Sequence, residues 1–241
     1  MLNYIYDKNI WITGASSGIG LELATILSKT KCNLLLSARN SEKLIKVASS
    51  ISGNAKVFAF PLDVSDTNAV NDTFEFIIGE VGFPNILINN AGVYIDKPFI
   101  DTTIDEFDFM INTNLKGYFN TTRAVLPSMI EFKGGAIVNI VSLTAIETFN
   151  NCAVYSASKS AVLSMMNCIR EEVREHNIKI INIIPGAVAT TIWSDAILNK
   201  HRHKMSSPRD IAEVVVNTLQ LSASDTSMIE NIVIKPQHPI F

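Results

Sequence analysis

The sequence is short of cysteine and of long apolar runs. Its three cysteines, Cys32, Cys152 and Cys168, are odd in number and form no Cys-x-x-Cys pair. This pattern argues against a disulfide framework and favours a reducing compartment. No apolar run approaches the ~18 residues that a membrane-spanning helix needs, and residues 1–7 lack the basic-then-apolar order of a signal peptide. We therefore expect a cytoplasmic protein without a membrane partner.

The sequence also lacks an excess of positive charge. Its net charge is −3 and only 18% of its 241 residues are charged, so there is no electrostatic basis for binding nucleic acid. Hydrophobic residues make up 47%, which is ample for one large core. Repeats, low-complexity tracts and linkers are absent as well. We therefore expect one domain over residues 1–241, without a nucleic-acid partner.

Apolar strand patterns alternate with helical patterns along the chain. Strands are expected at residues 9–13, 33–38, 56–60, 85–88, 135–141, 178–184 and 230–235. Helices are expected at residues 18–30, 41–51, 66–80, 103–131, 153–176 and 208–221, and residues 190–206 are expected to form a short lid. This alternation implies right-handed crossovers, so the predicted fold class is α/β, a doubly wound parallel sheet (Rossmann-like) with helices on both faces. Ligands of such sheets bind beyond the carboxyl ends of the strands.

A glycine-rich loop follows the first expected strand. Residues Gly14 to Gly20 have the spacing Gly-x-x-x-Gly-x-Gly and lead into a helical pattern. Glycines at this place let the backbone approach a ligand closely, and a helix N-terminus presents free N–H groups to phosphate. The loop therefore predicts a dinucleotide site.

The same loop also matches Gly-x-Ser-x-Gly, the nucleophile elbow of hydrolases. Four histidines, His176, His201, His203 and His238, follow it, so a Ser–Asp–His order is available in the sequence. An elbow on the first strand would have no sheet before it, however, and it would leave the motifs described next without a role. We therefore favour the dinucleotide site over the hydrolase.

A tyrosine and a lysine lie four residues apart in an expected helix, at Tyr155 and Lys159, and Ser142 ends an expected strand upstream. Residues i and i+4 share one helix face, so this pair can reach the same substrate. A free tyrosine has a pKa near ~10, and an ammonium beside it would lower that pKa. With Ser142 bound to the reacting oxygen, the set can interconvert an alcohol and a carbonyl. An isolated match is more often a surface pair, so this prediction depends on the dinucleotide site.

Six motifs in order between residues 9 and 190 resemble those of the short-chain dehydrogenase/reductase family. They are Thr13 to Gly20, Asp63-Val64, Asn89 to Gly92, Asn114, Ser142 placed before Tyr155-x-x-x-Lys159, and Pro185 to Thr190. The resemblance implies an NAD(P)-dependent enzyme that acts on CH–OH groups, with a small carbonyl or alcohol as substrate.

The resemblance also implies a role for each matching residue. Tyr155 is the expected proton donor in reduction and base in oxidation, and Lys159 lowers its pKa and holds the nicotinamide ribose. Ser142 positions the substrate oxygen, and Asn114 orders a water that relays protons through Lys159. The residues expected to bind the cofactor are Gly14, Ser16, Ser17, Gly18, Ile19, Gly20, Arg39, Asp63, Val64, Asn90, Ala91, Gly92, Tyr155, Lys159, Pro185, Gly186, Val188 and Thr190.

The end of the second expected strand bears on the choice of cofactor. NAD-preferring relatives would carry an acidic residue at about Ala38, whereas this sequence has Ala38 followed by Arg39. An arginine offers a planar cationic fork that suits a 2′-phosphate. We therefore favour NADP(H) over NAD(H), although Ser17 stands where some NADP-preferring relatives have a second basic residue.

The substrate side carries weaker signals. An apolar pocket is expected under Ile192, Trp193, Ile197 and Leu198, with Tyr94 and Ile146 on the opposite wall, and core packing explains each of these residues equally well. The basic run His201 to Lys204 suggests a metal pair or an anionic substrate. Two histidines at i and i+2 on a loop lack a third ligand, so no metal site is expected.

Two further expectations concern assembly and the alternative to catalysis. By resemblance we expect a homo-oligomer, a tetramer or a dimer, paired through residues 103–131 and 153–176. Candidate contact residues are Phe119, Met129, Met165 and Met166, although some of them must face the sheet. The alternative is a catalytically silent dinucleotide sensor or scaffold, but such chains usually lose the tyrosine, the lysine or the serine.

Overall fold

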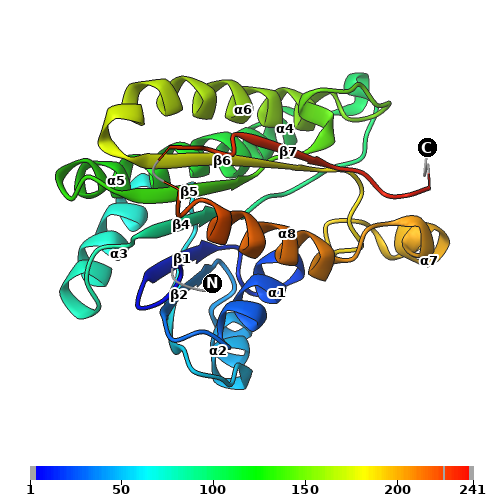
Figure 1. The fold of residues 1–241 in the computed structure, drawn as a ribbon. Helices are drawn as coiled ribbons and strands as arrows, with labels where there is room; N and C mark the ends of the chain where they lie inside the picture. Colours follow the sequence, from blue (N-terminus) through cyan, green and yellow to red (C-terminus); the bar gives the residue numbers. More distant parts are fainter. Residues whose placement is uncertain (1–3, 225, 239–241) are drawn as a thin grey trace.

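The computed structural model describes residues 4–224 and 226–238, which form seven parallel strands and the helices that cover them (Figure 1). The strands are β1 Asn9–Thr13, β2 Asn33–Ala38, β3 Lys56–Pro61, β4 Ile86–Asn89, β5 Gly135–Ile140, β6 Ile178–Pro185 and β7 Asn231–Ile234. Their order in the sheet is β3-β2-β1-β4-β5-β6-β7. The chain thus runs outward from β1, returns to β4 and runs outward again, which confirms the predicted doubly wound sheet.

Helices cover both faces of this sheet. The α-helices of the described residues are α1 Gly18–Leu27, α2 Ser41–Ser50, α3 Thr67–Glu80, α4 Ile104–Ile111, α5 Gly117–Glu131, α6 Ala153–Val173, α7 Asp195–His201 and α8 Pro208–Leu221, of which α7 lies beyond the edge of the sheet. One core joins α1, α2 and α8 to the sheet, and a second core on the other face joins α3, α5 and α6 (Figure 1). Within β1, Ile10 and Ile12 enter the first core and Trp11 enters the second. Because both faces are covered, the strands consist mainly of apolar residues, most of them buried.

A row of asparagines crosses four strands of the sheet, from the last residue of β4 to the first residue of β7, and all but the exposed Asn231 are buried. Asn89, Asn139, Asn182 and Asn231 are paired residues of β4, β5, β6 and β7. Each amide donates its Nδ2 hydrogen to the Oδ1 of the next, at 3.1, 3.0 and 2.9 Å. A shift of one residue would turn any of these side chains to the other face, so the row specifies the strand register. Since Asn89 is the last residue of β4, the same bonds hold the start of the segment that follows it.

The helical region predicted over 103–131 is confirmed as one unbroken helical run over residues 104–131, but it contains an irregular turn that the sequence did not predict. The run divides into α4, a π-helical turn at Asn112–Lys116 and α5. The π turn holds one extra residue, and such turns occur often at functional sites. It contains Asn114, whose amide bonds to the backbone of Val93 in a distant segment. The apolar periodicity of the sequence continues across residues 112–116, so it gives no sign of the π turn. The turn is marked instead by the contact between Asn114 and Val93, which lies outside the helix.

Two other predicted elements also differ from the structure. The predicted helix over 153–176 ends at Val173, a 3₁₀ turn follows at Arg174–His176, and Asn177 then takes a left-handed conformation with φ 54°. The predicted lid over 190–206 is not a plain loop, because it contains α7 and a 3₁₀ turn at Arg202–Lys204. Ser194 caps α7 by accepting a hydrogen bond from the backbone N–H of Ile197.

Candidate active site

A cavity of about 1110 Å³ opens at the carboxyl edge of the sheet. Its walls come from the segments that follow β1, β2, β3, β4, β5 and β6, and from the chain after β7. In Figure 1 this edge is the one on the side of α7. The volume exceeds the roughly 300–1,000 Å³ of pockets for one small ligand. The cavity therefore has room for a large ligand and a second molecule beside it.

The glycine loop forms the floor of the cavity between β1 and α1. Gly14 and Gly18 have left-handed backbones, with φ 66° and 55°, which favour glycine. A Cβ atom at Gly14 would lie 2.9 Å from the Cα of Ala91, and one at Gly20 would overlap the carbonyl oxygen of Gly14. The loop is therefore packed too closely for side chains. The hydroxyl of Ser17 makes no capping bond to α1, so the first N–H groups of this helix are available to a phosphate.

Two side chains hold the loop in this shape. The Thr13 hydroxyl accepts hydrogen bonds from the backbone N–H groups of Asn90 and Ala91, at 3.0 and 3.1 Å. The Asn90 amide donates to the carbonyl oxygens of Thr13 and Gly14, at 2.9 and 3.1 Å. The segment after β4 is thus tied to the loop after β1. Thr13 belongs to the motif but was not predicted as a site residue; its place at the strand end was the available signal.

The segment after β2 lines the cavity with cations. Arg39 lies beside Ala38, and its guanidinium stacks over the ring of Phe109, 5.2 Å from the centroid. Lys43, in the first turn of α2, lines the same part of the cavity. Sequence reasoning missed Lys43, although its position four residues after Arg39 was the available signal. This end of the cavity therefore has two cations and suits an anionic group.

Most of the residues predicted to bind a cofactor line this cavity. They are Gly14, Ser16, Ser17, Gly18, Ile19, Arg39, Val64, Asn90, Ala91, Gly92, Tyr155, Lys159, Pro185, Gly186, Val188 and Thr190. Gly20 and Asp63 are not among the lining residues. Gly20 is a buried residue of α1, and the Asp63 carboxylate accepts hydrogen bonds from the backbone and hydroxyl of Ser65, at 2.9 and 2.7 Å. The side chain of Asp63 thus stabilises the turn after β3.

The predicted catalytic side chains meet at the centre of the cavity. Ser142 follows β5 and hydrogen-bonds the Tyr155 hydroxyl, and its oxygen also accepts from the N–H and hydroxyl of Thr144, at 3.2 and 3.0 Å. Lys159 lies one turn along α6 from Tyr155, with its Nζ 6.0 Å from the tyrosine ring centroid. A serine and a tyrosine therefore present two hydroxyl groups to the same point, with an amine behind them.

The predicted lowering of the tyrosine pKa is not found in this geometry. Burial raises the pKa of Tyr155 to about 12, and the hydrogen bond with Ser142 offsets this only in part. Burial also lowers the pKa of Lys159 to about 7. The Lys159 amine donates to the carbonyl of Ile140 at 2.9 Å and to the Tyr118 hydroxyl at 3.3 Å, not to Tyr155. Burial therefore outweighs the attraction between the amine and the phenolate.

Tyr118 is a buried contact of this lysine that sequence reasoning missed. Its hydroxyl donates to the Ile140 carbonyl at 2.7 Å and accepts from Lys159, and its ring centroid lies 4.8 Å from the lysine Nζ. Tyr118 is four residues after Asn114, and this spacing was the available signal. The Lys159 ammonium therefore lies against the Tyr118 ring and donates hydrogen bonds to two acceptors, the Ile140 carbonyl and the Tyr118 hydroxyl.

Asn114 does not line the cavity, and its amide is used to join elements. It accepts from the N–H of Val93 at 2.8 Å and donates to the Val93 carbonyl at 2.9 Å and to the Ser158 hydroxyl at 3.1 Å. Gly92 lies between Asn114 and the active lysine, because a Cβ there would be 3.4 Å from Asn114 Oδ1 and 3.7 Å from Lys159 Nζ. Asn114 thus holds the segment after β4 against α6, beside Lys159.

The predicted substrate side is partly correct. Tyr94, Ile192 and Trp193 line the cavity, whereas Ile146, Ile197 and Leu198 do not. Leu198 faces inward from α7 and is buried, and Ile146 is half exposed after the short 3₁₀ turn Leu143–Ala145.

The basic run His201 to Lys204 lies outside the cavity lining, at the end of α7 and in the 3₁₀ turn after it, not on a loop. Within residues 4–224 and 226–238, no three His, Cys, Asp or Glu side chains are grouped in a way that could hold a metal ion. In the same described residues, no helix combines the length and the apolar character needed to cross a membrane.

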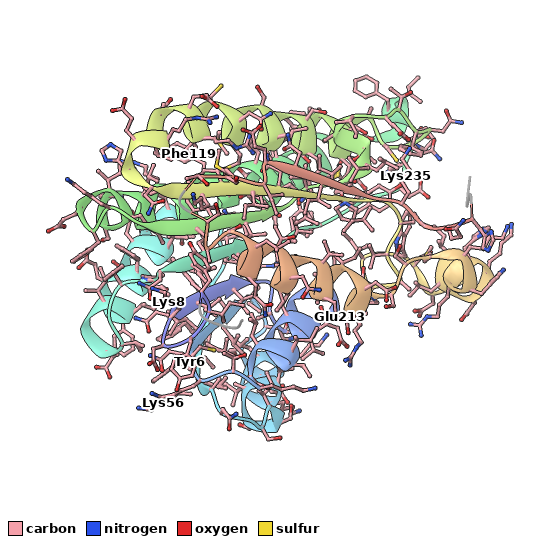
Figure 2. All side chains as sticks on the ribbon, in the orientation of Figure 1. Tyr6, Lys8, Lys56, Phe119, Glu213 and Lys235 are labelled. Carbon is pink, nitrogen blue, oxygen red and sulfur yellow. The ribbon has the colours of Figure 1, made fainter. Side chains whose placement is uncertain are left out.

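Two of the four expected contact residues for an oligomer prove to be core residues. Met129 and Met166 are fully buried against the sheet, because α5 and α6 turn those positions inward. Phe119, labelled in Figure 2, is 46% exposed, and Met165 is partly buried against the same core. Only Phe119 therefore presents a large apolar surface on these helices at the expected positions.

Known proteins resemble this chain in sequence and in fold. The short chain dehydrogenase family matches residues 8–201. An uncharacterized oxidoreductase of Staphylococcus aureus (strain MW2) is 35% identical over 218 residues, which cover 90% of this chain and 93% of the relative.

Two solved structures are similar over nearly their whole length. An alcohol dehydrogenase from the archaeon Thermococcus sibiricus, complexed with 5-hydroxy-NADP, superimposes with a TM-score of 0.86 at 25% identity and covers 97% of this chain and 99% of that one. A metagenomic short-chain oxidoreductase in complex with NADP gives a TM-score of 0.82 at 30% identity, with coverages of 98% and 100%.

Proposed function

The chain belongs to the short-chain dehydrogenase/reductase family of NAD(P)-dependent oxidoreductases, and on that premise we propose that it interconverts a carbonyl compound and a secondary alcohol with NADP(H). One observation carries the proposal. The hydroxyls of Ser142 and Tyr155 converge beside Lys159 in the cavity whose floor is the glycine loop. Proton transfer and cofactor binding thus share one space.

The residues that line the cavity suit a dinucleotide. The glycine at position 14 lets the backbone approach a pyrophosphate closely, and the free N–H groups of α1 can bind it. A side chain on the glycine loop would prevent this approach. Lys159 is within reach of a ribose placed between the loop and Tyr155. When bound, the nicotinamide ring supplies a hydride to the substrate carbon or accepts one from it.

Tyr155 moves the proton that accompanies the hydride. In reduction its hydroxyl donates a proton to the carbonyl oxygen, while Ser142 donates a hydrogen bond to that oxygen. The carbonyl thereby gains one hydride and one proton and becomes the alcohol. With its pKa raised to about 12, Tyr155 keeps its proton at neutral pH, which suits a donor. Oxidation needs the phenolate, so alcohol oxidation should rise with pH.

Lys159 restores the proton that Tyr155 loses. An amine whose pKa is about 7 can hold and release a proton near neutral pH. The Tyr155 phenolate left by reduction is stabilised by the adjacent ammonium. We place the relay water of the family beside Gly92, where the missing side chain leaves space next to Asn114 and Lys159.

The preference for NADP(H) rests on the segment after β2. Ala38 offers no carboxylate to a ribose hydroxyl, and Arg39 and Lys43 supply two positive charges. Stacking on Phe109 holds the Arg39 guanidinium in place, which reduces the entropy lost when it binds a phosphate. The two solved structures described above each hold an NADP compound. The silent sensor is disfavoured because all four catalytic side chains are present.

The test is a screen of ketones, aldehydes and secondary alcohols with NADPH, NADH and their oxidised forms, followed by nicotinamide absorbance. Tyr155→Phe is the matched control, since it keeps the ring and loses the hydroxyl. We expect turnover in the wild type with NADPH and none above background in the control. Cofactor binding without turnover of any compound would favour the silent sensor instead.

We also propose a homo-oligomer that pairs through α4, α5 and α6. Phe119 on α5 and Phe107 on α4 leave large apolar surfaces exposed, as expected of helices that a second copy covers. Sedimentation should give a mass above that of one chain. A single-chain mass at every concentration would overturn this part of the proposal.

A further inference from the structure

Three aromatic rings surround the reacting end of the cavity. The ring of Tyr94 lies edge-on to Tyr155, with centroids 4.9 Å apart at 66°, and edge-on to Trp193, with centroids 5.2 Å apart at 70°. Tyr155 carries the catalytic hydroxyl, so a group attached to the reacting carbon lies within reach of the other two rings. Ile192 and Leu143 add aliphatic surface to the same lining.

The polar atoms of these two rings are bonded to the protein. The Tyr94 hydroxyl contacts the Cys152 sulfur at 3.3 Å, and the Trp193 Nε1 donates to the carbonyl of Val188 at 3.0 Å. Burial raises the pKa of Cys152, so its thiol stays uncharged. What Tyr94 and Trp193 present to a substrate is therefore their ring surface.

The charges at this end do not favour an anion. The carboxylates of Asp96 and Glu147 line the cavity, together with His238 and Lys235. Lys235, labelled in Figure 2 after β7, forms an ion pair with Glu147, so its charge is already balanced. The basic run on α7 is not part of the lining, and Arg39 and Lys43 lie at the other end of the cavity, after β2. Apart from Lys159, whose amine lies behind Tyr155, the charge that a substrate carboxylate would meet here beyond the Glu147–Lys235 pair is the negative charge of Asp96.

We propose that the substrate is an uncharged carbonyl compound, or its alcohol, whose larger substituent is a flat apolar ring that packs against Tyr94 and Trp193. This inference rests on the proposed function, and it names the class of substrate that the site selects. Edge-to-face contacts prefer a planar ring over a flexible chain of similar area. Asp96 disfavours acids and phosphates through charge repulsion, and Glu147 holds Lys235 in an ion pair, so that the Lys235 ammonium does not attract them.

Three ketones of related size test the inference with NADPH. They are acetophenone, 2-octanone, which has the same number of carbons without a ring, and 4-acetylbenzoate, which adds a carboxylate to the ring. We expect kcat/KM for acetophenone to exceed that for 2-octanone by about 3–10-fold, the range of an aromatic pair. We expect 4-acetylbenzoate to be the poorest of the three. Equal or reversed rates for the ring and the chain, or a preference for the acid, would overturn the inference.

Variants of the lining separate the ring from its hydroxyl. Tyr94→Leu should remove the preference for acetophenone over 2-octanone, whereas Tyr94→Phe, which keeps the ring and loses the Cys152 contact, should retain it. Glu147→Gln should raise kcat/KM for 4-acetylbenzoate and leave acetophenone unchanged, because it releases Lys235. A preference that survives Tyr94→Leu, or an acid rate that does not rise in Glu147→Gln, would count against the inference.

The same assays distinguish this inference from the proposed function. If 2-octanone or other aliphatic carbonyls are reduced in a Tyr155-dependent way and acetophenone is not, the enzyme stands and the substrate class is wrong. If no carbonyl consumes NADPH although NADPH binds, the proposed function itself fails.

Discussion

The two ends of the cavity are built differently. The cofactor end consists of tight turns directly after β1, β2 and β4, where Gly14 and Gly18 have left-handed backbones and Thr13 and Asn90 bond neighbouring turns together. The substrate end comes from longer segments after β4, β5 and β6 and from the chain after β7, and its rings meet only through packing. The cofactor end is fixed by backbone conformation and by hydrogen bonds to backbone atoms, and the substrate end by the packing of side chains.

This difference explains where substitutions should act. A side chain added to the glycine loop collides with backbone atoms, so that end has few alternatives. A ring exchanged at the substrate end changes the shape of a wall and leaves the backbone in place. Cofactor use should therefore be a stable property of this scaffold and substrate choice an adjustable one. Each prediction below tests whether the two ends are separable in this way.

The largest effect is expected where the two ends meet, at Tyr155. Tyr155→Phe keeps the ring that Tyr94 contacts and removes the proton donor, so kcat should fall by ~10²–10⁴-fold, as for the loss of a positioned acid. NADPH affinity, measured by fluorescence titration, should stay within about threefold of the wild type because the hydroxyl contributes little binding energy. Near-normal turnover would show that another group transfers the proton.

How much the sequence predicted follows the same division. The parallel sheet, the glycine loop and the Ser142, Tyr155 and Lys159 set could be predicted because each depends on local periodicity or on a residue type that a turn requires. The π turn at Asn112–Lys116 could not, since it depends on the bond between Asn114 and Val93.

The substrate end was predicted less well for the same reason. Trp193 and Ile192 were placed correctly in the lining, but Ile197 and Leu198, only a few residues further on, were not. They belong to α7, which turns Leu198 into the core, and the sequence suggested a loop there. The raised pKa of Tyr155 also escaped prediction, because burial depends on the whole fold.

The second largest effect is expected for Lys159, which serves both ends. Lys159→Met should lower kcat by at least ~10-fold and also weaken NADPH binding, since one amine supports the tyrosine and the ribose. Removing a buried amine should raise the melting temperature, by about 2–4 °C for each kcal/mol gained in a chain of this size. Ile140 keeps a donor in this variant, because the Tyr118 hydroxyl still bonds its carbonyl.

Calorimetry and cofactor titration on the same samples check both parts of this prediction. Lost turnover with unchanged NADPH affinity would remove the ribose role from Lys159. A lower melting temperature would mean that the contacts of the methylene chain and ammonium outweigh the burial of the charge.

A smaller effect, confined to the cofactor end, is expected for the double variant Ala38→Asp with Arg39→Leu. Loss of a well-formed charge-assisted contact of about 1.5–3 kcal/mol should weaken NADPH by roughly one to two decades. The new carboxylate should repel the 2′-phosphate and accept from the free ribose hydroxyl of NADH. The change should appear in KM for the cofactor, because the phosphate lies far from the reacting carbon.

Measuring kcat/KM for both cofactors and for two ketones tests separability directly. The NADPH to NADH ratio should fall while the ratio between the ketones stays the same. If the wild type already prefers NADH, or the cofactor ratio does not move, Arg39 is a solvated charge. If the ketone ratio moves as well, the two ends are coupled.

The smallest effect is expected for Tyr118→Phe, and it is a shift along the pH axis. The variant keeps the ring beside Lys159 and removes the hydroxyl that accepts from its ammonium at 3.3 Å. An acceptor favours the charged amine, so its loss should move the Lys159 pKa further below the present value of about 7. The ammonium form exists below that pKa, and the activity that depends on it should therefore decline at a lower pH than in the wild type.

The hydrogen bond between Lys159 and Tyr118 is long, and its acceptor is neutral, so the Lys159 pKa should fall by at most about one unit. This corresponds to a loss of kcat/KM of up to ~10-fold at pH 8 and little change at pH 6. The measurement is kcat/KM for NADPH as a function of pH, since this ratio reports the free enzyme. Tyr4→Phe is a matched control, because Tyr4 is a partly buried tyrosine outside the cavity lining. If the decline of kcat/KM at alkaline pH stays where it is in the wild type, or moves to higher pH, the Tyr118 hydroxyl does not affect the pKa of Lys159. If the decline moves to lower pH, Tyr118, a residue outside the recognised motifs, raises the pKa of the lysine on which both ends of the cavity depend.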